Sequence, residues 1–170
     1  MDIRRGGPGD ADTVLALLDA AVVWLNAQGN TEQWGTEPWS ADPRKVERVR
    51  GLCASGCWLA ELDGEPVGAL VVSAAPGAGV PPVEEPELYV NLLVTSRVHK
   101  GLGVGTALLD HARMLAGEQG VTLLRVDCFA GRGGALVRVY ERAGFTRSET
   151  FSVDRGDRVW PGQVLELRLP

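Results

Sequence analysis

Apolar residues recur along this chain with the spacings of short helices and short strands. Between residues 14 and 25 they return every three or four positions, after Asp10, a typical N-cap residue, and before Gly29, which ends the pattern. Shorter apolar runs bounded by glycine or proline are typical of strands, and Asp63-Gly64 predicts a hairpin turn. Helices are predicted over residues 10–27, 43–53, 103–115 and 135–143, and strands over residues 2–5, 57–62, 67–74, 88–94, 121–129, 145–153 and 163–169.

The order of these elements, β-α-α-β-β-β-α-β-α-β-β, predicts a mixed α/β fold built on one sheet. Residues 30–42 and the proline-rich residues 76–86 are predicted loops, and residues 160–162 (Trp-Pro-Gly) are a predicted turn into the last strand. The chain has no internal repeat and no linker-like segment. We therefore expect a single domain over residues 1–170, which is a common domain length.

Composition narrows the class of protein. Apolar residues make up 45% of the chain and charged residues 23%, as in an ordinary globular protein. The net charge of -5 argues against a broad basic surface for nucleic acid. Three cysteines without a Cys-x-x-Cys pair, and only two histidines, argue against a disulfide framework and against a metal site. We expect neither a nucleic-acid partner nor a metal.

The chain also lacks the signals of membrane insertion or export. No apolar run reaches about 18 residues, the length that a membrane span needs. Met1–Arg5 has no apolar segment behind it and so does not read as a signal peptide. Together with the cysteine count, this predicts a protein of the reducing cytoplasm that does not bind membranes.

The segment from Val94 to Leu109 carries the most informative motif. A predicted buried strand ends at Val94, three alternating glycines follow, and a helix begins at once. Glycines let a backbone approach a ligand closely, and the first amides of a helix attract anions. The motif therefore predicts an anion-binding loop, against the alternative of a glycine-rich packing turn. The glycines are Gly101, Gly103 and Gly105, with His99 and Lys100 beside them as possible positive charges.

A dinucleotide-binding loop is one interpretation of these glycines. Its pattern, Gly-x-Gly-x-x-Gly, would need a third glycine at Thr106 or Leu108, so both registers fail. Asp127 does lie at a suitable distance along the chain for a ribose contact. However, such a fold needs more βα repeats than follow residue 128, so this interpretation is the weaker one.

The loop and a second block together resemble the GNAT N-acetyltransferases. The run from Leu92 to Leu109 resembles the acetyl-CoA signature Arg/Gln-x-x-Gly-x-Gly/Ala before a helix, with Lys100 in the Arg/Gln position. Val139–Phe145 resembles the Tyr-Glu-x-x-Gly-Phe element of the same family, without the Asn that often precedes its helix. The element order agrees as well, so the resemblance spans nearly the whole chain.

The resemblance implies a fold, a cofactor and its binding residues. The fold would be the GNAT acyl-CoA N-acyltransferase fold, a splayed mixed sheet of about six to seven strands flanked by about four helices. The cofactor would be acetyl-CoA as acetyl donor, with its pyrophosphate in the loop. The implied cofactor-binding residues are Leu93, Val94, His99, Lys100, Gly101, Leu102, Gly103, Val104, Gly105, Thr106, Arg132 and Tyr140.

The resemblance also implies catalytic roles. Tyr140 would donate a proton to the departing thiolate, and a backbone amide near Leu93 or Val94 would polarise the thioester carbonyl. Glu87 is the candidate base, although a solvated strand-end carboxylate is the simpler interpretation of this residue. The residues that compete with it for the role of base are Glu84, Glu85 and Asp127.

Four further residues are candidates for binding the acceptor. Trp34 and Trp39 would form an aromatic wall for a cationic amine, or else fill the core. Asn91 is a polar residue in mid-strand that would face the cleft, or else be a satisfied core amide. Asp127 would line the acceptor pocket or anchor local structure.

The resulting hypothesis is an acetyl-CoA-dependent N-acetyltransferase acting on a primary amine of a small molecule or peptide. The alternatives are a catalytically silent acyl-CoA-binding sensor and, less favoured, a dinucleotide-binding enzyme. Homodimers are common in the family, so a homodimer is possible.

Overall fold

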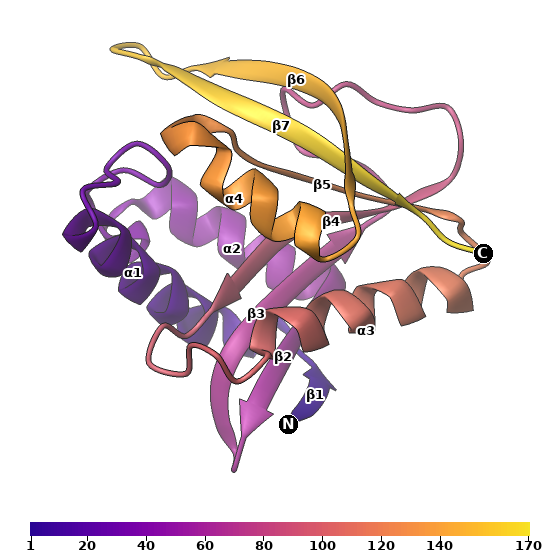
Figure 1. Ribbon diagram of the computed structural model, residues 1–170. Coiled ribbons are helices and arrows are strands. Elements are labelled where there is room, and N and C mark those ends of the chain that lie inside the picture. The colour runs from indigo at the N-terminus through magenta and orange to yellow at the C-terminus, as the bar shows by residue number, and fades with distance from the viewer. The chain divides into compact units, whose positions relative to one another are not determined.

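The computed structural model describes residues 1–170 and contains the predicted elements in the predicted order (Figure 1). None of the helices has the length and apolar character that crossing a membrane requires. The helices are α1 (Ala11–Ala27), α2 (Pro43–Gly56), α3 (Val104–Glu118) and α4 (Gly131–Arg142), with short 3-10 turns η1 (Pro8–Asp10) and η2 (Trp39–Ala41). The strands are β1 (Asp2–Arg5), β2 (Cys57–Leu62), β3 (Glu65–Ser73), β4 (Glu87–Thr95), β5 (Leu123–Phe129), β6 (Thr146–Asp154) and β7 (Val159–Arg168).

The seven strands form one mixed sheet in the order β1-β2-β3-β4-β5-β7-β6. The pair of β4 and β5 is parallel, whereas β1–β2, β2–β3, β5–β7 and β6–β7 are antiparallel. The chain divides into two compact units, one of residues 1–72 and 92–111 and the other of residues 73–91 and 112–170. Strand β4 is therefore shared, because its first residues belong to the second unit and its last ones to the first.

In the first unit, α1 and α2 pack on the strands through one apolar cluster. The cluster takes Leu18 and Val22 from α1, Val49 from α2, and Leu59 and Val71 from the strands, and all five side chains are buried. Burial of about 25 cal/mol for each Å² of apolar surface is the main force that holds these elements together. The same cluster includes Leu92 and Val94, so it fixes the end of β4 from which the glycine loop departs.

A glycine in β3 brings α3 close to the sheet. A Cβ atom at Gly68 would lie only 2.7 Å from Cγ1 of Val104 and 2.9 Å from Cδ1 of Leu108. Real Cβ atoms do not approach other atoms so closely, so any larger residue at position 68 would push the helix away. The start of α3 can therefore pack closely against β3 because residue 68 has no side chain.

In the second unit, β5 lies between β4 and β7, and the β6–β7 hairpin completes the group. The prediction of a turn at residues 160–162 is wrong, because these residues are part of β7, and the hairpin turns at residues 155–158 instead. Gly162 leaves room for the ring of Phe151, which lies opposite it on β6, because a Cβ atom at position 162 would overlap that ring. The glycine signalled a packing requirement rather than a turn.

Two helix starts lie close to their predicted positions. α4 begins at Gly131, but Arg132, Gly133 and Gly134 have φ of 56°, 67° and 74°, so its regular part begins after them, at the predicted Ala135. α3 begins at Val104, one residue after the predicted start, so Gly103 lies before the helix and Gly105 inside it.

Candidate active site

The loop between β4 and α3 is fixed at both ends by backbone hydrogen bonds. At its start, the Ser96 amide donates to the Val67 carbonyl of β3 at 2.7 Å, and at its end Ala107 N donates to Gly103 O at 2.9 Å. Within the loop, His99 N donates to Ser96 O and Leu102 N to His99 O. The loop is therefore a series of tight turns rather than an open strand.

Gly101 and Gly103 are needed for the course of this loop. Their φ values of 87° and 76° lie in the left-handed region, where a Cβ atom costs about 1–2 kcal/mol. Gly105 is different, because it is helical and a Cβ atom there would make an ordinary contact of 3.8 Å with Thr95. The three alternating glycines of the sequence thus have two separate roles.

The start of α3 presents backbone donors. Since the first helical hydrogen bond runs from Ala107 to Gly103, the amides of Val104, Gly105 and Thr106 have no acceptor within the helix. Together with the helix dipole they favour an anion at this end. Two side chains stand beside this end: Lys100 is exposed, while His99 is half-buried with its Nδ1 atom 3.0 Å from Ser96 Oγ.

Tyr140 lies on α4 and is buried. Its ring meets Phe145 edge-on, with the ring centroids 5.8 Å apart. The pKa of Tyr140 is raised, mainly because the side chain is buried and to a smaller extent because Cys128 and Asp127 lie nearby. The phenol therefore keeps its proton at neutral pH, as a proton donor must. Arg132, the other cofactor-binding candidate of this region, lies in the left-handed turn at the start of the same helix.

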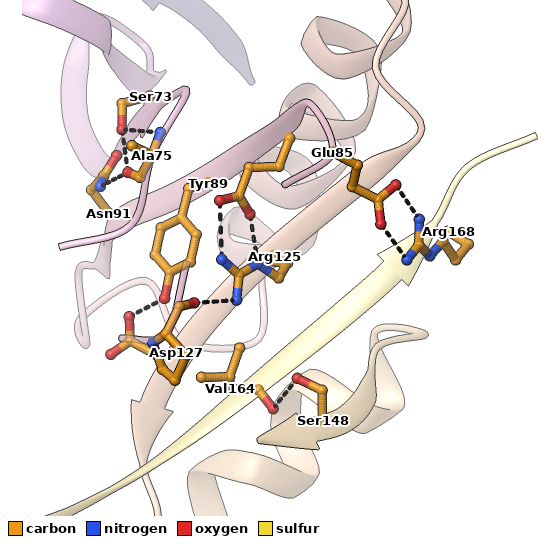
Figure 2. Close-up of polar contacts among 12 residues, drawn as sticks. Ser73, Ala75, Glu85, Tyr89, Asn91, Arg125, Asp127, Ser148, Val164 and Arg168 are labelled. Carbon is orange, nitrogen blue, oxygen red and sulfur yellow. Dashed lines mark hydrogen bonds and ion pairs between the residues drawn. The ribbon is translucent and has the colours of Figure 1, made fainter. Parts of the chain in front are cut away.

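A row of polar side chains follows alternate positions of β4 and β5 and continues to Glu85, just before β4, and to Arg168 at the end of β7 (Figure 2). Successive residues of a strand point to opposite faces, so residues two apart share a face. We call this set the polar row. It consists of Glu85, Glu87, Tyr89, Asn91, Arg125, Asp127 and Arg168.

Glu87 is held by Arg125 in a buried, two-pronged ion pair. Arg125 Nε donates to Glu87 Oε2 at 2.6 Å and Arg125 Nη2 to Glu87 Oε1 at 3.0 Å, and both side chains are at most 4% exposed. A third donor, Arg125 Nη1, reaches the Pro81 carbonyl at 3.1 Å. The hydrogen bonds that Arg125 donates to Glu87 are the largest cause that raises the pKa of Arg125.

This pair changes the interpretation of Glu87. The residue is not a solvated strand-end carboxylate, since only 5% of it is exposed. Both of its oxygens accept from a guanidinium, which favours an anchoring role over proton abstraction. Of the competing carboxylates, Glu85 is exposed and paired with Arg168 at 2.7 Å, and Glu84 is exposed. The role of base for Glu87 stays a prediction that this geometry does not favour.

Tyr89 was missed by the sequence analysis. Its hydroxyl donates to Asp127 Oδ1 at 2.5 Å across the parallel strands, and its side chain is fully buried. Burial, followed by Asp127, raises the pKa of Tyr89 far above its usual range. Polar residues at alternate positions of a strand that was predicted to be buried were the available signal.

Asn91 offers a buried acceptor atom. Its Nδ2 donates to the Ala75 carbonyl at 3.2 Å, which fixes the orientation of the amide (Figure 2). Its Oδ1 is buried and has no hydrogen-bond partner. An unpaired buried acceptor is costly, so this atom is a candidate site for a donor on a ligand.

The two tryptophans of the predicted acceptor wall have different surroundings. Trp39 is buried in the apolar cluster of the first unit, and the ammonium of Lys45 lies 5.1 Å from the centroid of its ring. Trp34 is only half-buried and meets Trp39 edge-on at 5.9 Å. Trp39 is therefore a core residue, and Trp34 is the one with an accessible surface.

Comparison with known proteins identifies the family. The model of the acetyltransferase (GNAT) family matches residues 17–145, which include the glycine loop and the Tyr140 block. The chain belongs to the acetyltransferase (GNAT) family. It is 30% identical over 151 residues to aminoglycoside N(6')-acetyltransferase type 1 of Klebsiella pneumoniae, a match that covers 83% of this chain and 75% of the relative. The same values hold for the enzyme of that name from Serratia marcescens.

Solved structures share the fold of this GNAT chain. The ribosomal-protein-alanine N-acetyltransferase of Brucella melitensis matches with a TM-score of 0.68 and 20% identity, over 99% of this chain and 100% of that one. Ard1 of Thermoplasma volcanium matches with a TM-score of 0.71 and 17% identity, over 99% and 97%. These likenesses confirm the predicted GNAT fold. The antiparallel pairs of the sheet also differ from the parallel sheet of a dinucleotide-binding fold.

Proposed function

We propose that this GNAT protein transfers an acetyl group from acetyl-CoA directly to a primary amine. The observation that carries the proposal is the start of α3, where the amides of Val104, Gly105 and Thr106 follow two left-handed glycines. Such amides bind a pyrophosphate without needing a basic surface, which suits a chain of net charge -5. The predicted contacts of Leu93, Val94, His99, Lys100, Leu102 and Arg132 with the cofactor belong to this proposal.

The chemistry needs one proton donor and one proton acceptor. A neutral amine nitrogen attacks the thioester carbonyl carbon, so an acceptor that arrives as an ammonium first gives one proton to the base or to water. The new C–N bond then forms, the C–S bond breaks, and the nitrogen releases a second proton. Tyr140, protonated because it is buried, gives its proton to the leaving thiolate. The protons of the amine leave through a base or a water path, and Asp127 is better suited than Glu87, whose two oxygens hold Arg125.

The acceptor is proposed to be a cationic amine. Asn91 Oδ1 is a buried acceptor atom without a partner, and Asp127 is a carboxylate in the same polar row. Both suit the N–H groups of an ammonium. The named relatives act on aminoglycosides, and the negative net charge favours approach of a cation. Aminoglycosides are therefore the first acceptors to test, ahead of polyamines, amino acids and peptides.

A silent acyl-CoA sensor is the alternative, and release of CoA thiol distinguishes the two. The transferase should release thiol from acetyl-CoA only when a primary amine is present, and Tyr140→Phe should slow that release. Binding of acetyl-CoA without amine-dependent release across the panel would favour the sensor. Stabilisation by NAD but not by acetyl-CoA in a thermal-shift experiment would contradict both.

Three expectations about the context of this protein stay predictions. They are a single domain over residues 1–170, a cytoplasmic location and a possible homodimer. The three cysteines, all free and buried, agree with a reducing compartment. Sedimentation of the purified chain would measure its oligomeric state.

A further inference from the structure

An arginine at the start of the glycine loop is stacked on α1. The Arg97 guanidinium lies over the ring of Trp24, with its Cζ atom 3.7 Å from the ring centroid. In the looser pair of Arg5 and Trp58 the same distance is 5.8 Å. Arg97 directly follows Ser96, whose amide is bonded to Val67. The loop is thus held to a strand by its backbone and to a helix by this side chain.

The stack is the contact that compensates for the burial of Arg97. The side chain is half-buried, and its Nε atom is buried without a hydrogen-bond partner. Burial lowers the pKa of Arg97, because the guanidinium loses part of its hydration and gains no anionic partner in exchange. A planar guanidinium stacked on an aromatic face keeps part of its stabilisation without water. The position of Arg97 therefore depends on Trp24.

The same helix also holds the segment of residues 28–42. Asp19 and Asn26 are seven residues apart and so lie on one face of α1. The Ser40 hydroxyl donates to Asp19 Oδ2 at 2.5 Å, and Asn26 Nδ2 donates to the Thr36 carbonyl at 3.3 Å. α1 therefore contacts the glycine loop through the stack of Arg97 on Trp24, and it is hydrogen-bonded to the segment that carries Trp34 and Trp39.

We propose that Arg97 is a positioning residue that couples the cofactor loop, through Trp24 and α1, to residues 28–42. The inference rests on the proposed function, because it takes the loop to be the site of the CoA pyrophosphate. When the loop amides bind the phosphates of CoA, the loop moves less. Because Arg97 stacks on Trp24, α1 then moves less as well. The segment that carries the proposed acceptor wall is then more ordered when CoA is bound.

Hydrogen exchange with and without saturating CoA tests this coupling. In the wild type, CoA should protect the amides of residues 98–106 and also those of residues 28–42. In Arg97→Ala, saturating CoA should still protect the loop but leave residues 28–42 unprotected, and the affinity for CoA should fall about fivefold to tenfold. Arg97→Lys, which keeps the charge but loses the planar stack, should resemble Arg97→Ala.

Arg5→Ala is the matched control, since it removes an arginine from the looser tryptophan pair in the same unit and should behave as the wild type. Protection of residues 28–42 that is unchanged in Arg97→Ala would overturn the coupling, as would a wild type in which CoA protects the loop alone. A wild type that does not bind CoA at all would overturn the proposed function, and the coupling with it. Loop protection by CoA in Arg97→Ala shows that the variant is folded.

Discussion

The glycine loop and the polar row are built in opposite ways. The loop makes its site from consecutive residues and from backbone amides, and its glycines permit the left-handed turns. The polar row makes its site from side chains on different strands, as with Tyr89 and Asp127, which lie 38 positions apart in the chain. A site made of backbone depends on φ and tolerates changes in many side chains, whereas a site made of paired side chains fails when one partner is lost.

The two regions are suited to different tasks, the glycine loop to binding the cofactor and the second unit to proton transfer. The loop offers backbone amides that suit an anion. The second unit contains the buried Tyr140, together with the carboxylate of Asp127 in the polar row. Variants in the loop should therefore change affinity for the cofactor, and variants in the second unit should change stability or turnover.

The largest expected effect is on the ion pair of the polar row. Arg125→Met leaves the carboxylate of Glu87 buried without its partner, which should lower the free energy of unfolding by about 3–5 kcal/mol. Urea unfolding followed by circular dichroism measures this change. The double variant Glu87→Leu with Arg125→Met removes both charges and should recover most of the loss. A single variant as stable as the wild type would contradict the buried pair.

The next effect concerns turnover. Tyr140→Phe keeps the packing against Phe145 but removes the proton donor, so kcat should fall by about a hundredfold while the KM for acetyl-CoA changes little. Steady-state kinetics of thiol release measures both constants. Equal kcat for Tyr140→Phe and the wild type across the pH range would exclude the acid role.

A smaller effect should separate the glycines of the loop. Gly103→Ala forces a Cβ atom into the left-handed region and should cost about 1–2 kcal/mol of stability. Gly105→Ala, inside the helix with room for the Cβ atom, should be neutral or add up to about 1 kcal/mol. Thermal unfolding of the two variants provides the comparison. Equal losses would mean that the two positions do not differ as described.

The smallest effect is a dependence on alkaline pH. The pKa of Tyr89 is raised in the folded protein, so its stabilisation is complete below the unfolded pKa of about 10 and is lost as the pH rises above it. Between about pH 8 and pH 10.5 the wild type should lose about 0.8 kcal/mol more than Tyr89→Phe. Urea midpoints at the two pH values give this difference. Parallel losses would mean that Tyr89 ionises normally in the folded state.

The sequence predicted what is local. The element order, the loop with Gly101 and Gly103, and the Tyr140 block all follow from neighbouring residues, and the family and fold are confirmed. Contacts between distant residues were not predicted. The pairing of Arg125 with Glu87 could not be predicted, because the two residues are 38 positions apart in the chain and meet only when β4 and β5 pair in the sheet. Gly162 was misread as a turn because its partner, Phe151, lies on the other strand of a hairpin.

The central claim is that the loop binds acetyl-CoA and that Tyr140 assists transfer of its acetyl group to an amine. Acetyl-CoA labelled with carbon-13 in the acetyl group, incubated with the wild type and an aminoglycoside, tests the claim directly by mass spectrometry of the amine. We predict an amine heavier by one labelled acetyl group, at a rate that Tyr140→Phe lowers about a hundredfold. Tight binding of acetyl-CoA with no label on any primary amine of the panel would contradict the account.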